Sequence, residues 1–195
     1  MDNGNGSLMR IAPIVPALLE VEEPHARYEA VRKASSLTHA HPLACACCFV
    51  FTEYLRRLCE GWDRESAYSW LCAEFADEYP FIGAEVRTKL GRVLDGRLTY
   101  LPEREIQSGG YVVHTLEAAL WCFLESDSYA ETVLKAAGLG RDADTTACVA
   151  GVAAALCWGR DAIPAAWIDG LAGRDELLRI ARKAAVQIRD REQED

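Results

Sequence analysis

Apolar residues recur along this chain at the spacing of an α-helix, and no segment alternates between apolar and polar positions for long. Between positions 24 and 37, for example, Tyr28, Val31 and Ala34 fall on one side of a helix. Prolines, acidic first turns and glycines mark where the helices begin and end. The predicted helices run over 24–37, 42–60, 63–79, 81–94, 111–124, 129–137, 144–158, from Pro164 onward and over 174–191.

Helices without strands predict an all-α fold, built as a compact helical bundle. Residues 95–110 contain glycines, a proline and scattered charges, and we expect them to form a loop. The sequence has no fixed-period repeat and no obvious linker. We therefore expect a single domain over 1–188, followed by an acidic, frayed tail over 189–195.

Composition narrows the classes of function. Half of the 195 residues are hydrophobic, and a chain of this length buries a core without help from disulfides or a structural metal. The net charge of −9 argues against nucleic acid and anionic membrane surfaces, which attract positive charge. The first ten residues do not resemble a signal peptide, and the apolar stretches 44–51 and 145–158 are shorter than the ~20 residues of a membrane span. These features predict a cytoplasmic protein.

Eight cysteines are many for that compartment. Cys45 and Cys48 form a C-x-x-C pattern, but no second Cys pair or His pair has the spacing of a zinc site. Most of the cysteines fall in apolar helical segments, where a free thiol packs as a small hydrophobic group. We expect them to be core residues.

The strongest candidate for chemistry is a glycine-marked turn that leads into the helix 144–158. Asp142, Asp144 and Thr145 supply oxygen ligands of the kind that Mg²⁺ takes, and one ion could touch both carboxylates from a turn. The alternative is ordinary capping of the backbone N–H groups at the helix start. Small residues along the following helix suit a site at the centre of the bundle, and they suit tight packing equally well.

A second candidate is the N-terminal loop. The Asn-Gly pairs that end at Gly4 and Gly6 expose backbone N–H groups, which can form a nest for an anion, and Ser7 adds a hydroxyl. The alternative is a mobile chain terminus with a turn.

Two further candidates stand at helix junctions. His39 follows Thr38 and could donate a hydrogen bond to a phosphate or a ribose. The alternative is that Thr38 caps a helix and that the histidine faces solvent. Tyr111 follows two glycines and could stack on a base or a sugar, although an aromatic at a helix start is also typical of a core.

Taken in this order, the segments resemble the ADP-ribosylglycohydrolase family, which includes the dinitrogenase reductase-activating glycohydrolases. The resemblance covers nearly the whole chain. The motifs that carry it are GNGSLMRIAP (4–13), SLTHAHP (36–42), GGYVVHTLEAALWCFLES (109–126), GRDADTTACVAGVAAALCWG (140–159) and IPAAW (163–167).

The resemblance implies an all-α orthogonal bundle around a binuclear Mg²⁺ or Mn²⁺ site, and an enzyme that hydrolyses ADP-ribose from modified protein side chains or related compounds. It implies that Asp142, Asp144 and Thr145 bind metal, that Asp144 is also catalytic, and that Asp2 assists ribose chemistry. Its substrate would be ADP-ribose or an ADP-ribosylated protein. The residues implied to contact that substrate are Asn5, Gly6, Ser7, His39, Gly110 and Tyr111.

The sequence departs from the family pattern in two places. The family begins with a Gly-rich helix start and a Thr-Asp-Asp run that supplies the other half of the metal ligands, and neither is in this sequence. Arg141 stands where the late motif usually has glycine, and its charge competes with cations unless it points to solvent or phosphate.

Three hypotheses follow. The chain is an active, metal-dependent hydrolase that corresponds to the C-terminal portion of the family domain, or it is a non-catalytic ADP-ribose-binding or interaction module. The third possibility is a truncated, inactive fragment. In that case apolar faces left by the missing N-terminal segment would be covered by self-association into a homo-oligomer.

Overall fold

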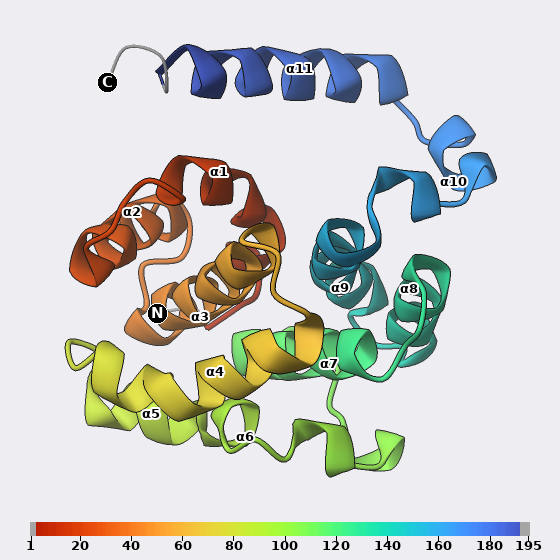
Figure 1. Ribbon diagram of the computed structural model, residues 1–195. Helices are drawn as coiled ribbons and strands as arrows, with labels where there is room; N and C mark the ends of the chain where they lie inside the picture. Colours follow the sequence, from red (N-terminus) through yellow and green to blue (C-terminus); the bar gives the residue numbers. More distant parts are fainter. Residues whose placement is uncertain (1–2, 192–195) are drawn as a thin grey trace.

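The computed structural model describes residues 3–191, apart from the side chains at 74, 76–78 and 189–191. Over this range the chain is all-α, as predicted, with an isolated bridge between Gly4 and Tyr111 but no strand (Figure 1). The α-helices are α1 (Val15–Leu18), α2 (Pro24–Ser36), α3 (Pro42–Cys59), α4 (Arg64–Glu78), α5 (Ala84–Lys89), α6 (Gly91–Leu94), α7 (Val112–Leu124), α8 (Tyr129–Gly138), α9 (Ala143–Trp158), α10 (Ala165–Asp169) and α11 (Arg174–Arg191).

Most helix ends lie where the sequence signals place them. The Glu23 carboxylate accepts hydrogen bonds from the first backbone N–H groups of α2, and Asp63 accepts one from the N–H of Ser66 at 2.8 Å. Gly159 ends α9 with a φ of 80°, a left-handed conformation that costs glycine little. Of the predicted tail, positions 189–191 close α11, and positions 192–195 lie outside the described residues.

The single helix predicted over 81–94 is wrong. Two short helices, α5 and α6, take its place, and the chain turns at Leu90, which ends one and begins the other. Gly91 follows at once, and a glycine inside a helix costs about 1 kcal/mol relative to alanine. The loop predicted over 95–110 is mostly irregular, with 3-10 turns at Leu98–Tyr100 and Glu103–Glu105.

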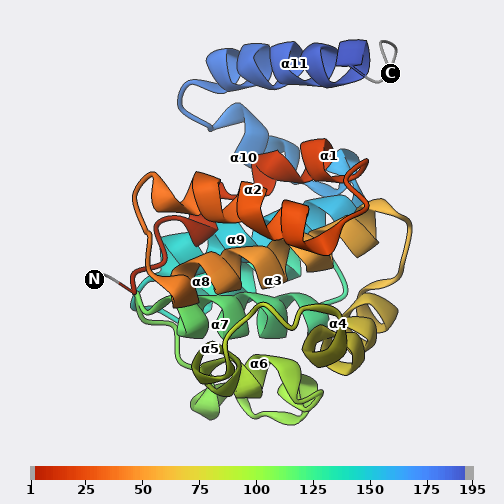
Figure 2. The ribbon, with the colours of Figure 1, turned by 90° about the vertical axis from the view of Figure 1, so that its left-hand side faces the viewer.

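Helix α3 is the centre of the bundle. Every side chain from Leu43 to Arg56 is buried, so this helix is enclosed on all sides rather than on one stripe. Figure 2 shows α3 between α2 and α7. The ring of Phe49 packs edge-on against Tyr28 and Tyr79, at 5.4 and 5.0 Å between ring centres.

Helices α7, α8 and α9 pack against one another beside α3, and the small residues of α9 allow close approach. A Cβ atom at Gly151 would lie 3.3 Å from Val133 of α8. Helix α11 stands apart from the bundle in both views (Figures 1 and 2), and the side chains described on it are exposed or half-exposed. Within residues 3–191, no helix is both long and apolar enough to cross a membrane.

The cysteines divide between core and surface. Cys45, Cys47, Cys48 and Cys122 are buried free thiols, as predicted, and burial raises the pKa of Cys48 to about 11. The expectation is wrong for three others, which are exposed. These are Cys59, Cys148 and Cys157.

Candidate functional site

The carboxylate of Asp142 is the meeting point of three segments that are distant in the sequence. The side-chain amide of Asn5 donates to its Oδ2 at 2.5 Å, and the hydroxyl of Thr145 donates to its Oδ1 at 3.0 Å. The backbone N–H of Asp142 donates to the carbonyl of Ser108 at 3.1 Å. The N-terminal loop, the loop before α7 and the start of α9 therefore converge on one acidic side chain.

These contacts overturn the capping interpretation of Asp142. The residue occupies the N-cap position of α9, but its carboxylate accepts no capping hydrogen bond from the helix backbone. Its backbone carbonyl instead accepts from the N–H and the hydroxyl of Thr146. The carboxylate is thus held by side chains and is directed toward the loops, which is unusual for a residue that only starts a helix.

The N-terminal loop is anchored, in contrast to the mobile-terminus alternative. The carbonyl of Asn3 accepts from the N–H of Val112 at 2.9 Å, and Gly4 pairs with Tyr111 in the isolated bridge. Asn5 is 8% exposed, and its amide also donates to the hydroxyl of Thr115 at 2.7 Å. A buried amide with two strong acceptors is fixed in orientation.

Gly6 and His39 lie against each other, although they are 33 positions apart in the sequence. A Cβ atom at position 6 would lie 2.8 Å from Cε1 and 3.2 Å from Nε2 of His39, so only glycine leaves room for the imidazole. His39 is half-buried, and its Nδ1 is 2.8 Å from the hydroxyl of Thr38. Thr38 is not a helix cap, because α3 is capped by His41.

The other predicted metal-binding residue, Asp144, has a different environment. Its carboxylate is exposed, and in the described part of the chain it has no hydrogen-bond or ion-pair partner. Asp142 is half-buried and Thr145 is buried, so the pair of carboxylates lies at the rim of the bundle rather than at its centre.

The structure does not bring every predicted residue to the same place. The side chain of Ser7 is fully buried, and its hydroxyl accepts from the thiol of Cys48 at 3.4 Å, so it faces the core and not the loops. Asp2, predicted to assist catalysis, lies outside the described residues.

Gly110 and Tyr111 lie on the side of Asp142 that faces the loop before α7. A Cβ atom at Gly110 would be 3.4 Å from Oδ2 of Asp142. The Tyr111 ring packs edge-on against His114, with 4.9 Å between centres, and both line a cavity of about 230 Å³. Burial lowers the pKa of His114 below its ordinary value, and the positive charges of Arg92 and Arg141 also lower it.

Three residues that hold the candidate site together were not predicted from the sequence. Thr115 accepts from Asn5, Ser108 holds the turn before Asp142, and Arg10 donates to the hydroxyl of Thr38 at 2.5 Å. Thr115 and Arg10 lie inside quoted motifs, at 109–126 and 4–13, so their motif membership was the available signal. Ser108 lies one position outside a motif.

Comparison with known proteins agrees with the motifs. The sequence profile of the ADP-ribosylglycohydrolase family matches residues 2–194. Two curated relatives are ADP-ribosylarginine hydrolases Tri1, from Pseudomonas putida (strain GB-1) and Serratia proteamaculans (strain 568). Each is 29% identical over 180 residues, which is 92% of this chain and 45% or 46% of the relative. The ADP-ribosyl-[dinitrogen reductase] glycohydrolase of Rhodospirillum rubrum is 28% identical over 170 residues, 87% of this chain and 51% of that protein.

A solved structure described as an ADP-ribosylglycohydrolase-related protein complex superimposes with a TM-score of 0.73 at 33% sequence identity. The match covers 89% of this chain and 56% of the solved chain. This chain spans about half the length of the curated relatives it matches. Because the family profile covers nearly every residue and the fold agrees, the chain belongs to the ADP-ribosylglycohydrolase family.

Proposed function

We propose that this chain binds ADP-ribose and hydrolyses the glycosidic bond that joins it to a protein side chain. Arginine is the side chain we favour, because two relatives are named ADP-ribosylarginine hydrolases. The observation that carries the proposal is the position of Asp142, whose carboxylate is held by Asn5 and Thr145 at the point where the family motifs converge.

The phosphates of ADP-ribose are assigned to the pair of Gly6 and His39. Arg10 donates to the Thr38 hydroxyl, which leaves the hydroxyl hydrogen free for Nδ1 of His39. In that arrangement Nε2 carries the imidazole proton and is a donor, which suits a phosphate oxygen. The Gly6 backbone approaches the same ring without a side chain between them.

Asp142, Asp144 and Thr145 would hold Mg²⁺ or Mn²⁺. The donor set fits the ion, because two carboxylates and a hydroxyl are hard oxygen ligands and Mg²⁺ keeps several waters beside one or two carboxylates. Asp144 is exposed, and the described residues offer it no competing partner. A bound ion of this kind supplies Lewis-acid stabilisation and lowers the pKa of a coordinated water.

The protein's own contribution is orientation. Cleavage at ribose C1′ develops oxocarbenium character, so the ribose must be fixed while positive charge grows on the ring. The two hydrogen bonds of the Asn5 amide, to Asp142 and Thr115, fix the carboxylate against α7. Gly110 brings backbone to the same carboxylate with no Cβ in the way, which keeps this face open to the sugar.

The test is release of ADP-ribose from ADP-ribosyl-arginine by the purified chain with Mg²⁺ or Mn²⁺. Asp144→Asn should abolish turnover while leaving the fold intact, because this carboxylate supports no internal contact. Asp161→Asn, at an exposed carboxylate of a surface 3-10 turn, is the matched control and should keep full activity. Full activity in Asp144→Asn would overturn the assigned role.

A second candidate function is binding of ADP-ribose without hydrolysis. It is favoured by the scarcity of ligands, since the described residues contain no group of three or more His, Cys, Asp or Glu suited to a metal ion. Calorimetric titration with ADP-ribose, with and without Mg²⁺, separates the two candidates. Metal-independent binding without turnover supports the binding module, and metal-dependent binding with turnover supports the hydrolase.

A further inference from the structure

Arg141 adopts a backbone conformation that side chains avoid. Its φ is 56°, and within residues 3–191 it is the one residue other than glycine with a positive φ. The left-handed region places Cβ too close to the following carbonyl oxygen, so arginine is strained here where glycine would not be. The strain stands directly before Asp142, beside the candidate site.

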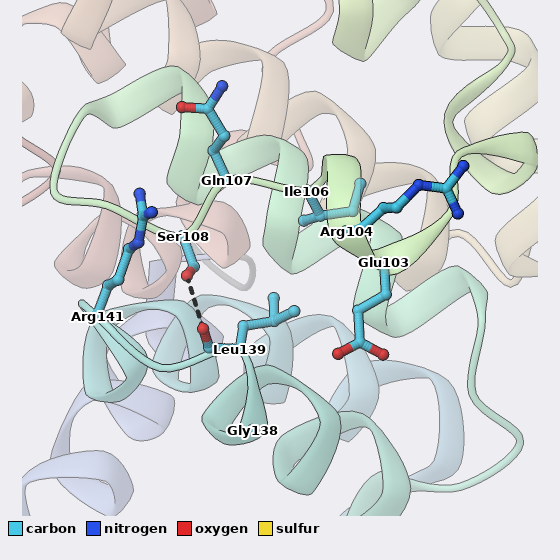
Figure 3. A pocket seen from close by; sticks show the side chains of 8 residues that line it. All are labelled: Glu103, Arg104, Ile106, Gln107, Ser108, Gly138, Leu139 and Arg141. Carbon is cyan, nitrogen blue, oxygen red and sulfur yellow. Dashed lines mark hydrogen bonds between the residues drawn. The ribbon is translucent and has the colours of Figure 1, made fainter.

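The Arg141 side chain has no structural task that would explain its presence. It is exposed, and its guanidinium has no hydrogen-bond or ion-pair partner among the residues described. It lines an open cavity of about 510 Å³ together with Gln107 and Ser108. Figure 3 shows Arg141 and Gln107 extending in the same direction from either side of Ser108, whereas Arg104 and Glu103 extend away at the far end.

The surroundings favour a negative ligand. Gln107 lines both this cavity and the smaller one formed by Tyr111 and His114, so the two openings adjoin. The positive charges of Arg141 and Arg92 both act on His114, although Arg92 is itself paired with Glu117 at 2.9 Å. Arg104 and Glu103 at the far end of the larger cavity also have no ion pair among the residues described, and Arg141 is the unpaired guanidinium that directly precedes Asp142.

The position relative to Asp142 indicates which part of a substrate Arg141 would meet. The pair assigned to the phosphates, Gly6 and His39, is joined to Asp142 through Asn5. Arg141 instead lies between Gly140 and Asp142, both of which are hydrogen-bonded to Ser108. Ser108 belongs to the same loop as Gly110 and Tyr111. A group bound there would lie near the scissile bond and apart from the phosphates.

We propose that Arg141 is a specificity-determining residue that, with Gln107, binds a carboxylate on the protein whose ADP-ribosylated side chain occupies the site. The inference rests on the proposed function. Guanidinium and carboxylate match in geometry through paired N–H donors, and the neighbouring Gln107 amide can add a third donor. The preferred targets would therefore carry Asp or Glu beside the modified arginine.

The experiment uses four fluorescent peptides with one central arginine, flanked by Asp or by Asn, each with and without ADP-ribose on the arginine. Fluorescence anisotropy measures the affinity of each peptide for three forms of the protein, which are the wild-type chain, Arg141→Gly and Arg104→Ala. The wild-type chain should bind the Asp-flanked, ADP-ribosylated peptide about three- to fivefold more tightly than the Asn-flanked, ADP-ribosylated peptide, as expected for an exposed ion pair. Arg141→Gly should lose the preference, and Arg104→Ala, from the far end of the cavity, should keep it.

Higher salt should weaken the preference, because exposed charges are screened. Equal affinity for Asp- and Asn-flanked peptides overturns the inference, and so does a preference that survives in Arg141→Gly. Weaker binding of free ADP-ribose by Arg141→Gly also overturns it, because the side chain would then hold the substrate's own phosphates. If ADP-ribosylation adds no affinity to either peptide, the proposed function fails instead, and the Asp–Asn comparison still decides the role of Arg141.

Discussion

At the scale of single residues, the site depends on one amide. Asn5 links the N-terminal loop to α7 through Thr115 and to α9 through Asp142, across 110 and 137 positions of sequence. Because the amide is buried, any change to one acceptor leaves a donor without its partner, which costs more than the hydrogen bond itself contributes.

This arrangement predicts the effect of Thr115→Val, which keeps the shape of the side chain and removes the acceptor. We expect a loss of about 1–2 kcal/mol of stability and about tenfold weaker ADP-ribose binding, because Asn5 would no longer hold Asp142 in place. The matched control is Thr132→Val, at a buried threonine of α8 that donates to Ser128. Urea unfolding should show a similar loss for both variants, and titration should show weaker binding for Thr115→Val alone.

The residue scale also shows what the sequence could not predict about the site. Motif resemblance named the segments that converge, but Ser7 turns its hydroxyl to Cys48 in the core although its neighbour Asn5 faces the site. Which side chain of a loop faces inward depends on the three-dimensional path of the loop, and local composition does not determine that path. Thr115 was missed for the same reason, since its partner is contributed from 110 positions away.

At the scale of elements, α2 and α3 are joined by a buried ion pair. Arg27 of α2 donates two hydrogen bonds, both 2.8 Å, to the carboxylate of Glu53 on α3, and Tyr79 donates a third at 2.7 Å. Glu53 is 0% exposed. A pair of this kind gives little net stability relative to an apolar contact, but removing one partner leaves a buried charge uncompensated.

Glu53→Ala should therefore destabilise the fold by about 3–5 kcal/mol. The chain offers a close control, because Glu29 and Arg32 form an equally short pair on the exposed face of α2. Glu29→Ala should leave the urea midpoint of unfolding unchanged, since exposed pairs contribute little. Equal midpoints for the two variants would show that burial does not control the strength of these pairs.

The elements were the most predictable part of the molecule. Helices that begin at a strong local signal, such as Pro24, Pro42 or Asp63, start where the sequence places them, because the capping contacts involve residues within one turn. The segment 81–94 has no capping side chain, and Leu90 is buried at the junction of two short helices. Tertiary burial of that leucine overrides the local helical pattern.

At the scale of the whole molecule, the reactivity of the cysteines measures which parts of the bundle are protected from solvent. Alkylation with iodoacetamide at pH 8 should modify the exposed Cys59, Cys148 and Cys157 and leave the buried Cys47 and Cys48 unmodified until urea is added. The thiolate is the reactive form, and burial raises the pKa of Cys48 to about 11, so only about one thiol in a thousand is ionised at pH 8. Reactivity should increase as pH rises toward that value.

Mass spectrometry of the alkylated peptides reads each site separately, except that Cys47 and Cys48 are adjacent and need fragmentation to be resolved. If Cys48 reacted as fast as Cys157 in the folded protein, the packing of α3 against the N-terminal loop would be wrong. The unfolded chain serves as the internal control, because all eight thiols then react alike.

The left-handed backbone at Arg141 has a genetic consequence. Glycine and arginine codons are interconverted by a single base change, so one point mutation exchanges a relaxed, uncharged turn for a strained, charged one. A left-handed φ suits glycine better than arginine, and under the proposal made above only the arginine form would prefer peptides that carry a carboxylate. Selection acting on that one codon could therefore retune which proteins are recognised without passing through an intermediate residue.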